Sequence, residues 1–434
     1  MTPEITNWAS LDDAAREALL LRPAIGSDTA IREQVARIIA DVKTAGDAAV
    51  ASLTARLDKV QIADARVTAE EIAAATSELS ASALAAIDLA IDNVRKFHEL
   101  QLPQALRIET MPGVVCEKRS HAIDAVGLYV PAGTAPLPSA AVMLAVPAAI
   151  AGCPVRIMCT PPRPDGRADP AVLAAAVRAG VRDIYKIGGA QAVAAMAYGT
   201  ATVPKVGKIF GPGNAWVTSA KTQVSADPAG AAIDMPAGPS EVLVIADATA
   251  DAAFVASDLL SQAEHGVDSQ VILVTTCKQL AAEVQQQLRQ QLASLSRRKI
   301  AAEALQFARI VLVADLPAAI EVSNRYAPEH LILQCANARE QLASIRNAGS
   351  VFVGPWTPES VGDYCSGTNH VLPTYGYART YSGLGVEQFM RQMTVQELTR
   401  DGLQQLGDAV ITLAGLEGLD AHAEAVRIRL ESSE

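Results

Sequence analysis

The chain has 434 residues, half of them hydrophobic, and carries 36 Lys and Arg against 47 Asp and Glu, a formal net charge of −11. A chain of this length and composition can bury a sizeable core spread over about two to four domains. Because no run of basic residues interrupts the negative charge, the composition argues against a nucleic-acid or anionic-membrane partner and favours a small-molecule site.

The first 26 residues are predicted to form an N-terminal helical extension. In "MTPEITNWASLDDAAREALLL", Ser10 stands where a helix N-cap is expected, with Asp13 three residues later. The stretch lacks the basic region and apolar core of a signal peptide, and apolar runs such as "SAAVMLAVPAAIAG" are too short to span a bilayer. Six cysteines without a C-x-x-C pair are typical of free thiols in a reducing compartment. We therefore predict a cytoplasmic protein with no membrane span.

Residues 27–120 are predicted to be a helical segment, as "AIREQVARIIADVKTAGDAAVASL" illustrates. The apolar face of such helices needs a partner. We assign the segment to the second of the two lobes that follow, although the pattern by itself does not decide between them.

Two stretches have the same alternating pattern. Residues 121–238 alternate short apolar runs with Ala-rich helical stretches, starting with "AVGLYVP", "SAAVMLAVPAAIAG" and "PVRIMCT". Residues 239–380 repeat this with "SEVLVIAD", "SQVILVTT", "ARIVLVAD", "EHLILQC" and "SVFVG", separated by helices. Such alternation is typical of βαβ units and a parallel sheet covered on both faces. The predicted fold class is α/β, with two doubly wound, incomplete Rossmann-like parallel-sheet lobes and helical extensions at both ends.

An irregular stretch follows the last predicted strand. Residues 354–385 are rich in Gly, Pro and Tyr and show little periodicity, which is unusually long for a connector and favours a working loop. Residues 381–434 are predicted to form a C-terminal helical extension, which closes with "DAHAEAVRIRLE".

Two polar pairs stand out in the second lobe. Gln262 and His265 are three residues apart at the end of an apolar helix, just before Gly266, and so share one helix face. Glu329 and His330 follow a helix in "YAPEHLIL", and a Glu-His pair that faces a cleft is a candidate for general acid–base chemistry. Surface polarity for the first pair, and a capping Glu beside a half-buried His for the second, remain open alternatives.

Two further histidines come with carboxylates. Asp363 and His370 lie in the irregular stretch, where turn chemistry is the alternative to a functional role. His422 is placed in the first turn of the last helix, two residues after Asp420 as N-cap, where the helix dipole favours a neutral imidazole. A mixture of nitrogen and oxygen donors suits Zn²⁺, with Mn²⁺ or Co²⁺ as substitutes, and the chain offers it in Gln262, His265, Asp363 and His422. The spacing alone does not show that these four converge.

Three junctions of the first lobe could approach a phosphate. They are "YVPAGTAPLPS" (129–139), "KIGGAQAV" (186–193) and "IFGPGNAW" (209–216), each a strand, a turn of small residues and a helix start. Such junctions favour a dinucleotide at the carboxyl ends of the strands. Each is weak by itself, because the glycines serve turns equally well and G-x-G-x-x-G is missing.

Taken as an ordered series, the motifs point to one family. The chain resembles histidinol dehydrogenase through "YVPAGTAPLPS", "KIGGAQAVAAMAYGT", "IFGPGN", "IDMPAGPSEVLVIAD", "LLSQAEHG", "APEHL" and "GTNHVLPT", and the resemblance runs from about residue 10 to the C-terminus. Ala132 stands where a second glycine is usual, and Gly207 stands where an aspartate is common. Neither position carries one of the roles below, although both bear on nucleotide affinity.

The resemblance implies an enzyme that oxidises L-histidinol to L-histidine with two NAD⁺ through a bound aldehyde. The implied zinc ligands are Gln262, His265, Asp363 and His422. The implied substrate-binding residues are Ser240, Gln262, His265, His330, Asp363, His370, Glu417 and His422. Glu329 and His330 would be the proton-transfer pair, and the implied NAD contacts are Tyr129, Gln191 and Asn214.

The resemblance further implies a homodimer whose C-terminal segments cross, so that Glu417 and His422 serve the partner's site. Histidinol carries an imidazole and an amine, both metal-binding groups, and fixing it on zinc would turn binding into orientation. We hypothesise that His330 takes the hydroxyl proton and that Glu329 helps to activate the water which attacks the aldehyde.

Two other interpretations remain. Cys116 or Cys153 could form a thiohemiacetal, as in a cysteine-dependent aldehyde dehydrogenase, but neither has a flanking base in the sequence. Two α/β lobes could also close around a ligand without catalysis, as in a small-molecule binding protein.

Overall fold

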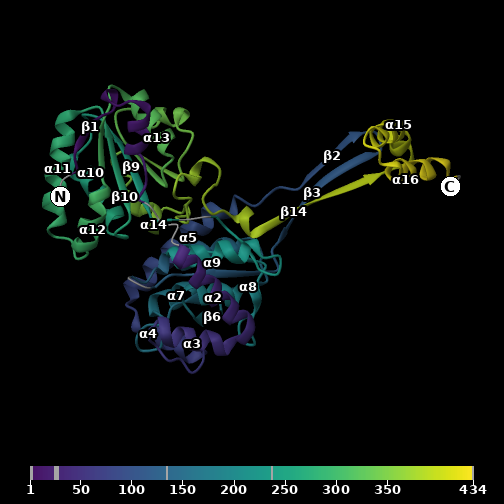
Figure 1. Ribbon diagram of the computed structural model, residues 1–434, viewed down its shortest axis with the longest axis horizontal. Coiled ribbons are helices and arrows are strands. Elements are labelled where there is room, and N and C mark those ends of the chain that lie inside the picture. Colours follow the sequence, from purple (N-terminus) through teal and green to yellow (C-terminus); the bar gives the residue numbers. More distant parts are fainter. Residues whose placement is uncertain (1–2, 24–28, 133–134, 236–237, 433–434) are drawn as a thin grey trace.

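Two parallel sheets and one antiparallel ribbon organise the chain (Figure 1). The computed structural model describes residues 3–23, 29–132, 135–235 and 238–432. Each parallel sheet is the centre of a lobe, and the ribbon forms an arm that projects away from both lobes. The predicted fold class, two doubly wound lobes, is confirmed.

The first lobe is built on a five-stranded parallel sheet in the order β6-β5-β4-β7-β8. Its strands are β4 (Ala125–Tyr129), β5 (Val155–Thr160), β6 (Asp183–Lys186), β7 (Lys208–Phe210) and β8 (Ala232–Ile233). The connecting helices are α6 (Pro138–Ile150), α7 (Pro170–Arg178), α8 (Gly189–Tyr198) and α9 (Ala215–Ala226). Most residues of α6 and α8 are buried, because these helices pack on the sheet and are covered on their outer side.

The cover comes from the helical segment that precedes the sheet. Its helices are α2 (Thr29–Ala45), α3 (Asp47–Leu57), α4 (Ala69–Glu78) and α5 (Ala81–Glu99). α2 packs on α8 and α9, α4 on α7, and α5 on α6. Residues 29–99 therefore belong with the first lobe, and our assignment of this segment to the second lobe is wrong. The apolar face of α2 joins the same core as the alanines of α8. A helix pattern reveals such a face but not the surface that it meets.

The second lobe holds a six-stranded parallel sheet in the order β1-β11-β10-β9-β12-β13. Its strands are β1 (Ile5–Asn7), β9 (Glu241–Ala246), β10 (Gln270–Thr275), β11 (Arg309–Leu312), β12 (His330–Gln334) and β13 (Ser350–Val353). Its helices are α1 (Asp13–Leu19), α10 (Ala252–Ala263), α11 (Lys278–Leu292), α12 (Arg298–Ala304), α13 (Leu316–Tyr326) and α14 (Glu359–Tyr364). Only a short 3-10 helix, Glu340–Ser344, stands between β12 and β13, where a helix was expected.

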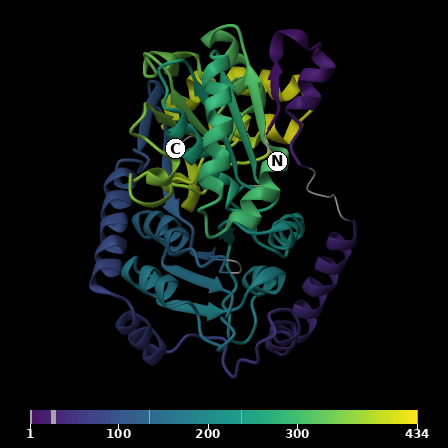
Figure 2. The same ribbon diagram turned by 90° about the vertical axis from the view of Figure 1, so that its left-hand side faces the viewer.

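The N-terminal extension is part of this sheet. β1 adds to the edge strand β11, and α1 begins after Asp12, whose side chain accepts a hydrogen bond from the Ala15 amide at 2.8 Å. The N-cap is therefore Asp12 and not Ser10, whose hydroxyl donates instead to the Asn7 carbonyl. Figure 2 shows the N-terminal segment against the upper lobe and the helices that follow it against the lower lobe.

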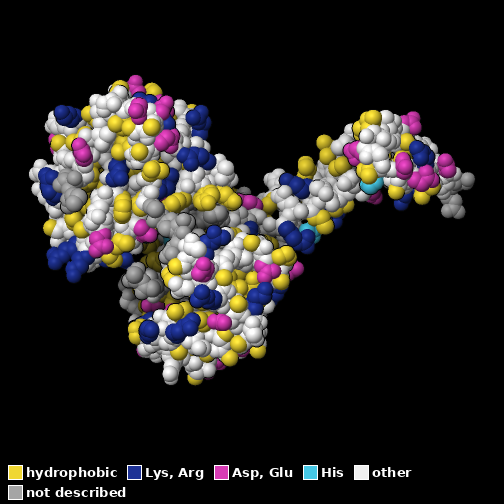
Figure 3. Space-filling view, viewed as in Figure 1, with side chains coloured by type: hydrophobic (Ala, Val, Ile, Leu, Met, Phe, Trp, Pro, Cys, Tyr) yellow, Lys and Arg dark blue, Asp and Glu magenta, His cyan; other side chains and the backbone are white. Residues whose placement is uncertain are grey.

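The arm combines segments far apart in the sequence. β2 (Leu106–Met111), β3 (Val114–Ala122) and β14 (Met390–Leu398) form an antiparallel sheet in the order β14-β3-β2, capped by α15 (Arg400–Leu416) and α16 (Asp420–Glu431). The predicted C-terminal helical extension, residues 381–434, thus contains the strand β14 before its two helices. In the predicted helical segment 27–120, most of the residues from Leu106 onward lie in β2 and β3. Hydrophobic side chains lie exposed at the end of the arm, Leu416 at 80% (Figure 3).

Within the described ranges, no single helix combines the length and the apolar composition needed to cross a membrane. The bent pair α4–α5 meets those two criteria only when both helices are counted together.

Candidate active site

A cleft of about 780 Å³ separates the two lobes and is lined by both. The first lobe contributes the carboxyl edge of its sheet, with Asn214 in the turn after β7. The second lobe contributes the amino edge of its sheet, with Ser240 directly before β9, and also His265 after α10. Ligands of open α/β sheets usually lie at carboxyl edges, so only the first lobe follows that rule.

Glu329 and His330 lie at the same amino edge, where α13 passes into β12. Both side chains are buried, and Glu329 Oε2 lies 3.5 Å from His330 Nδ1. The backbone of Glu241 contacts both residues, because its N–H donates to Glu329 Oε2 at 2.8 Å and its carbonyl lies 3.0 Å from His330 Nδ1. A carbonyl only accepts hydrogen bonds, so His330 carries a proton on Nδ1 and, when neutral, has a lone pair on Nε2.

The free nitrogen of His330 faces the cluster around Asp363. His330 Nε2 is buried and has no hydrogen-bond partner among the described residues, and it lies 3.7 Å from Asp363 Oδ1. Burial lowers the pKa of His330, but the nearby Glu329 and Glu359 carboxylates outweigh it, so the pKa is raised above its usual value. Burial raises the pKa of Glu329, against the opposing effect of His330. The two residues therefore form one buried proton-exchanging pair.

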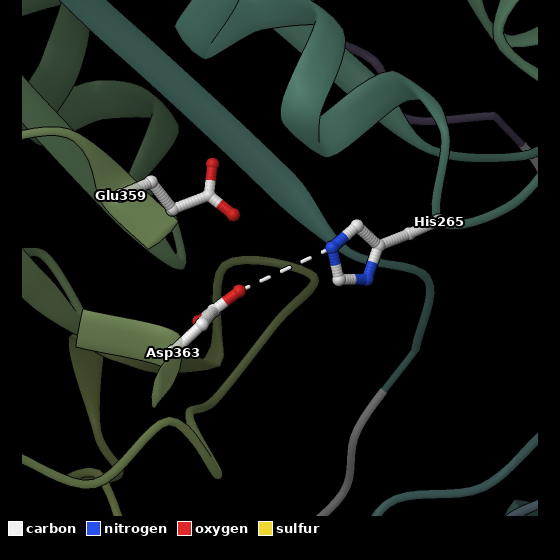
Figure 4. A group of neighbouring side chains, drawn as sticks. All are labelled: His265, Glu359 and Asp363. Carbon is white, nitrogen blue, oxygen red and sulfur yellow. Dashed lines mark ion pairs between the residues drawn. The ribbon is translucent and has the colours of Figure 1, made fainter. Parts of the chain in front are cut away.

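Asp363 sits among three imidazoles. Besides His330, its Oδ1 lies 3.8 Å from His370 Nδ1, and its Oδ2 lies 4.0 Å from His265 Nε2 (Figure 4). Burial raises the pKa of Asp363, but the nearby ring of His330 and the other two rings lower it further, so the net shift is downward. Burial lowers the pKa of both His265 and His370. An ionised carboxylate beside neutral imidazoles is what a divalent cation requires.

Gln262 and His265 hold the positions that their spacing predicted. α10 ends at Ala263, and the His265 amide donates to the Gln262 carbonyl at 3.2 Å, which continues the turn past the helix end. Gln262 is fully buried. With its amide nitrogen turned towards Glu359, it lies 2.8 and 3.1 Å from the two carboxylate oxygens and 3.1 Å from His330 Nδ1. It donates to Glu359, because Nδ1 already carries the proton that faces the Glu241 carbonyl.

Glu359 is the residue that sequence reasoning missed. Its carboxylate shares a 4.8 Å cluster of metal-binding atoms with His265 and Asp363, and in Figure 4 it points into the same space. Burial raises the pKa of Glu359 to about 8. The signal was present in "PESVGDY", because Glu359 and Asp363 are four apart and share one face of α14.

Glu417 and His422 are not brought to this cluster within one chain. Both are exposed at the far end of the arm, Glu417 at the end of α15 and His422 in the first turn of α16 (Figure 1). α16 begins one residue earlier than expected, with Leu419 and not Asp420 at the N-cap position.

The three expected nucleotide contacts lie on the first lobe. Asn214 lines the cleft and caps α9, and together with Gln191 it lines a second cavity of about 760 Å³. Gln191 donates to Asp58 at 3.1 Å. Tyr129 is buried, and its hydroxyl accepts from the Gly189 amide at 3.0 Å, so its phenol covers the start of α8 and does not line either cavity.

The glycine-rich motifs are partly structural. Gly211 has a φ of +120°, and a Cβ there would meet the Tyr129 carbonyl oxygen at 2.1 Å, so this turn requires glycine whatever binds nearby. Asp234 accepts a hydrogen bond from the Gly211 amide, and Lys221 donates one to the Gly211 carbonyl, both at 2.8 Å. These two bonds fix the loop that leads to Asn214. Residues 133–134 and 236–237, within two of the motifs, lie outside the described residues.

Neither candidate cysteine lies at the cluster. Cys153 is buried in the core of the first lobe, where burial raises its pKa and its thiol lies 3.5 Å from the Phe389 carbonyl. Cys116 lies on β3 of the arm. A low-pKa, accessible thiol beside the Glu-His pair is what a thiohemiacetal route needs, and these two positions do not provide it.

The chain is similar to known proteins over nearly its whole length. A family model described as histidinol dehydrogenase matches residues 22–430. Histidinol dehydrogenase of Vibrio cholerae is 56% identical over 424 residues, which cover 98% of this chain and 97% of the relative. That of Colwellia psychrerythraea is 51% identical over 431 residues, 99% of each chain. The crystal structure of histidinol dehydrogenase from Elizabethkingia anophelis superposes with a TM-score of 0.95 at 44% identity, covering 99% of this chain and 98% of that one.

Proposed function

The chain belongs to the histidinol dehydrogenase family of NAD-dependent oxidoreductases, which catalyse the last steps of histidine biosynthesis, and from this premise we propose that it oxidises L-histidinol to L-histidine in two hydride transfers through a bound aldehyde. One observation carries the proposal. The buried Glu329–His330 pair and the cluster of Asp363 with His265 and His370 meet at one place beside the cleft.

The residues at this place fit a zinc ion. Two ligands of one Zn²⁺ at about 2.0–2.2 Å can be no more than about 4.4 Å apart, and the 4.0 Å between His265 Nε2 and Asp363 Oδ2 meets that limit. We propose Gln262, His265, Asp363 and the partner's His422 as the ligands, with Glu359 close enough to serve as a ligand or to hold the Gln262 amide. A zinc ion bound there would bind the imidazole and the amine of the substrate.

Proton transfer falls to the residues of this chain. His330 Nε2, with its lone pair, takes the proton from the substrate hydroxyl as the hydride leaves for NAD⁺, which gives the aldehyde, NADH and an imidazolium. Glu329 then draws a proton from the water that adds to the aldehyde, and the hydrate loses the second hydride to a second NAD⁺. His370 is placed to hold the substrate, because its buried Nε2 has no partner among the described residues. Ser240 faces the same cleft.

The nucleotide is proposed to bind on the first lobe. Asn214 joins the two cavities at the carboxyl edge of that sheet, and Gln191 lies in the second cavity. Tyr129 would act through the start of α8, since its hydroxyl is bonded to the Gly189 amide.

The site is proposed to be completed in a homodimer. Glu417 and His422 are exposed at the end of the arm, where hydrophobic residues such as Leu413, 61% exposed, lie uncovered. A second copy of the chain would bury this surface and receive the two polar residues. L-Histidinol is the proposed partner molecule, and cytoplasmic location without a nucleic-acid or membrane partner stays a prediction.

The test is to mix the purified protein with L-histidinol and NAD⁺ and to follow NADH by absorbance. Two NADH for each histidinol, lost on metal chelation and regained with Zn²⁺, is the expected result. Activity that survives chelation would favour the cysteine-dependent aldehyde dehydrogenase, and histidinol binding without NADH would favour the non-catalytic two-lobed protein.

A further inference from the structure

The backbone that holds the Glu329–His330 pair belongs to Glu241, the first residue of β9. Its N–H and its carbonyl lie in the two successive peptide groups that meet at the Cα of Glu241. The N–H binds one carboxylate oxygen of Glu329, and the carbonyl determines which nitrogen of His330 carries the proton. A shift of the backbone at residue 241 would disturb both contacts. The position of Glu241 is therefore part of the geometry of the pair.

The side chain of Glu241 is itself clamped. Its carboxylate is 1% exposed and accepts two hydrogen bonds from Arg22, Nε at 2.5 Å and Nη2 at 2.9 Å, and one from the Tyr375 amide at 2.7 Å. Arg22 also donates to the Tyr326 carbonyl at 2.9 Å and lies 3.9 Å above the ring of Tyr326. A bidentate guanidinium–carboxylate pair fixes orientation as well as position.

Arg22 reaches this place from the N-terminal segment, 219 residues away in the sequence. The segment is tied down on both sides of Arg22, because Gln270 donates to the Leu21 carbonyl at 3.1 Å and the Tyr375 hydroxyl donates to the Pro23 carbonyl. Gln270 in turn accepts from the Tyr326 hydroxyl at 2.8 Å. These contacts hold the backbone on both sides of Arg22 and so position its guanidinium against Glu241.

We propose that Arg22 and Glu241 are positioning residues for catalysis, which hold the Glu329–His330 pair through the backbone of residue 241. The inference rests on the proposed function, because it needs that pair to transfer protons. A buried ion pair is a costly way to stabilise a fold, since both charges lose their hydration. Because the paired carboxylate and the backbone groups that hold the pair belong to the same residue, Glu241, the ion pair also fixes that backbone.

The test replaces Arg22→Met, which keeps the apolar part of the side chain and removes the charged fork. We expect kcat with L-histidinol to fall at least about tenfold while KM changes less than about threefold, because the proposed ligands Gln262, His265 and Asp363 come from α10, the turn after it and α14, away from Glu241. The same loss is expected when the aldehyde is supplied as substrate, since Glu329 and His330 share the one anchor. Zinc content should equal that of the wild type.

Two further variants separate positioning from general loss of structure. Arg22→Lys keeps the charge but not the fork, and we expect a kcat between those of wild type and Arg22→Met. Arg325→Met is the matched control, because it breaks the exposed 2.7 Å ion pair of Arg325 with Glu17, which ties the same N-terminal segment to α13. It should keep the wild-type kcat.

A wild-type kcat in Arg22→Met, or a raised KM at unchanged kcat, would overturn the inference. So would an equal loss of kcat in Arg325→Met. Should Arg22→Met fail to fold, Arg22→Lys decides by the same comparison of kcat and KM. A wild-type protein that does not oxidise L-histidinol would reject the proposed function instead.

Discussion

His330 Nε2 and Asp363 Oδ1 lie 3.7 Å apart and both residues are buried in the second lobe, so the proposed base and a proposed metal ligand are close neighbours. A substrate held at the metal would place its hydroxyl within reach of the ring. Although the two residues are close, their roles can be separated by experiment, because the base acts on the chemical step and the metal ligand acts on binding.

Replacing His330→Asn should lower kcat by about 10²–10⁴-fold, because the amide cannot take the hydroxyl proton. KM for L-histidinol should change little, since the proposed ligands stay in place. Stopped-flow measurement of NADH formation checks both constants. His121→Asn, at an exposed position on β3, is the control and should behave as wild type. Near-normal turnover in His330→Asn would reject its role.

Replacing Asp363→Asn should remove most of the bound zinc, because a neutral amide beside three imidazoles is a poor substitute for the carboxylate. Glu359→Gln should keep more zinc, with affinity weakened by about 10–100-fold as for a residue that orients a ligand. Metal analysis after dialysis against a chelator series ranks the two. The opposite ranking would make Glu359 the main carboxylate ligand.

Mixing two inactive variants tests the crossing of the arms. Dimers of His330→Asn with His422→Asn should contain one intact site, so random exchange should restore about a quarter of the wild-type activity. Mixing His330→Asn with Glu329→Gln should restore none, because both residues belong to the same chain's site. If the first mixture stays inactive although heterodimers form, His422 serves its own chain or no site.

The buried Asp258 should make stability depend on pH. Burial raises its pKa to about 7, although the Gln334 amide donates to it at 2.6 Å. A raised folded-state pKa favours the protonated form, so its contribution to stability is present below about pH 4 and is lost as the pH rises through about 7. Asp258→Asn should therefore stabilise the protein by about 2–4 kcal/mol at pH 8.5 and by about half as much at pH 5.5.

Urea unfolding at the two pH values measures this difference. Asp408→Asn, on the exposed face of α15, is the control and should change stability equally little at both. A gain that is the same at pH 5.5 and 8.5 would show that the carboxylate of Asp258 is not responsible.

The elements that the sequence predicted well are those whose signal is local. The apolar runs of β9 and β10 are buried throughout, as continuous hydrophobic strands of a parallel sheet must be. The spacing of Gln262 and His265 likewise placed both at the end of α10. What failed depended on distant contacts, because the helical face of α2 carries no mark of the lobe that it meets.

The candidate site shows the same division. Asp363 and His370 could be picked out as a carboxylate and an imidazole in an irregular stretch, whereas Glu359 was missed although its four-residue spacing from Asp363 places both on one helix face. Glu241 was invisible for a different reason. Its contribution comes from backbone N–H and C=O groups, which almost every residue possesses, and only the three-dimensional structure shows which of them meet the pair.

In the proposed dimer, the reach of the arm means that an inactivating change in one chain also affects the site of its partner. A chain altered at both His330 and His422 would lack the base in its own site and would also leave the site of an unaltered partner without its histidine ligand. One such chain would disable an entire pair, whereas a chain altered at either residue alone would leave one of the two pockets working.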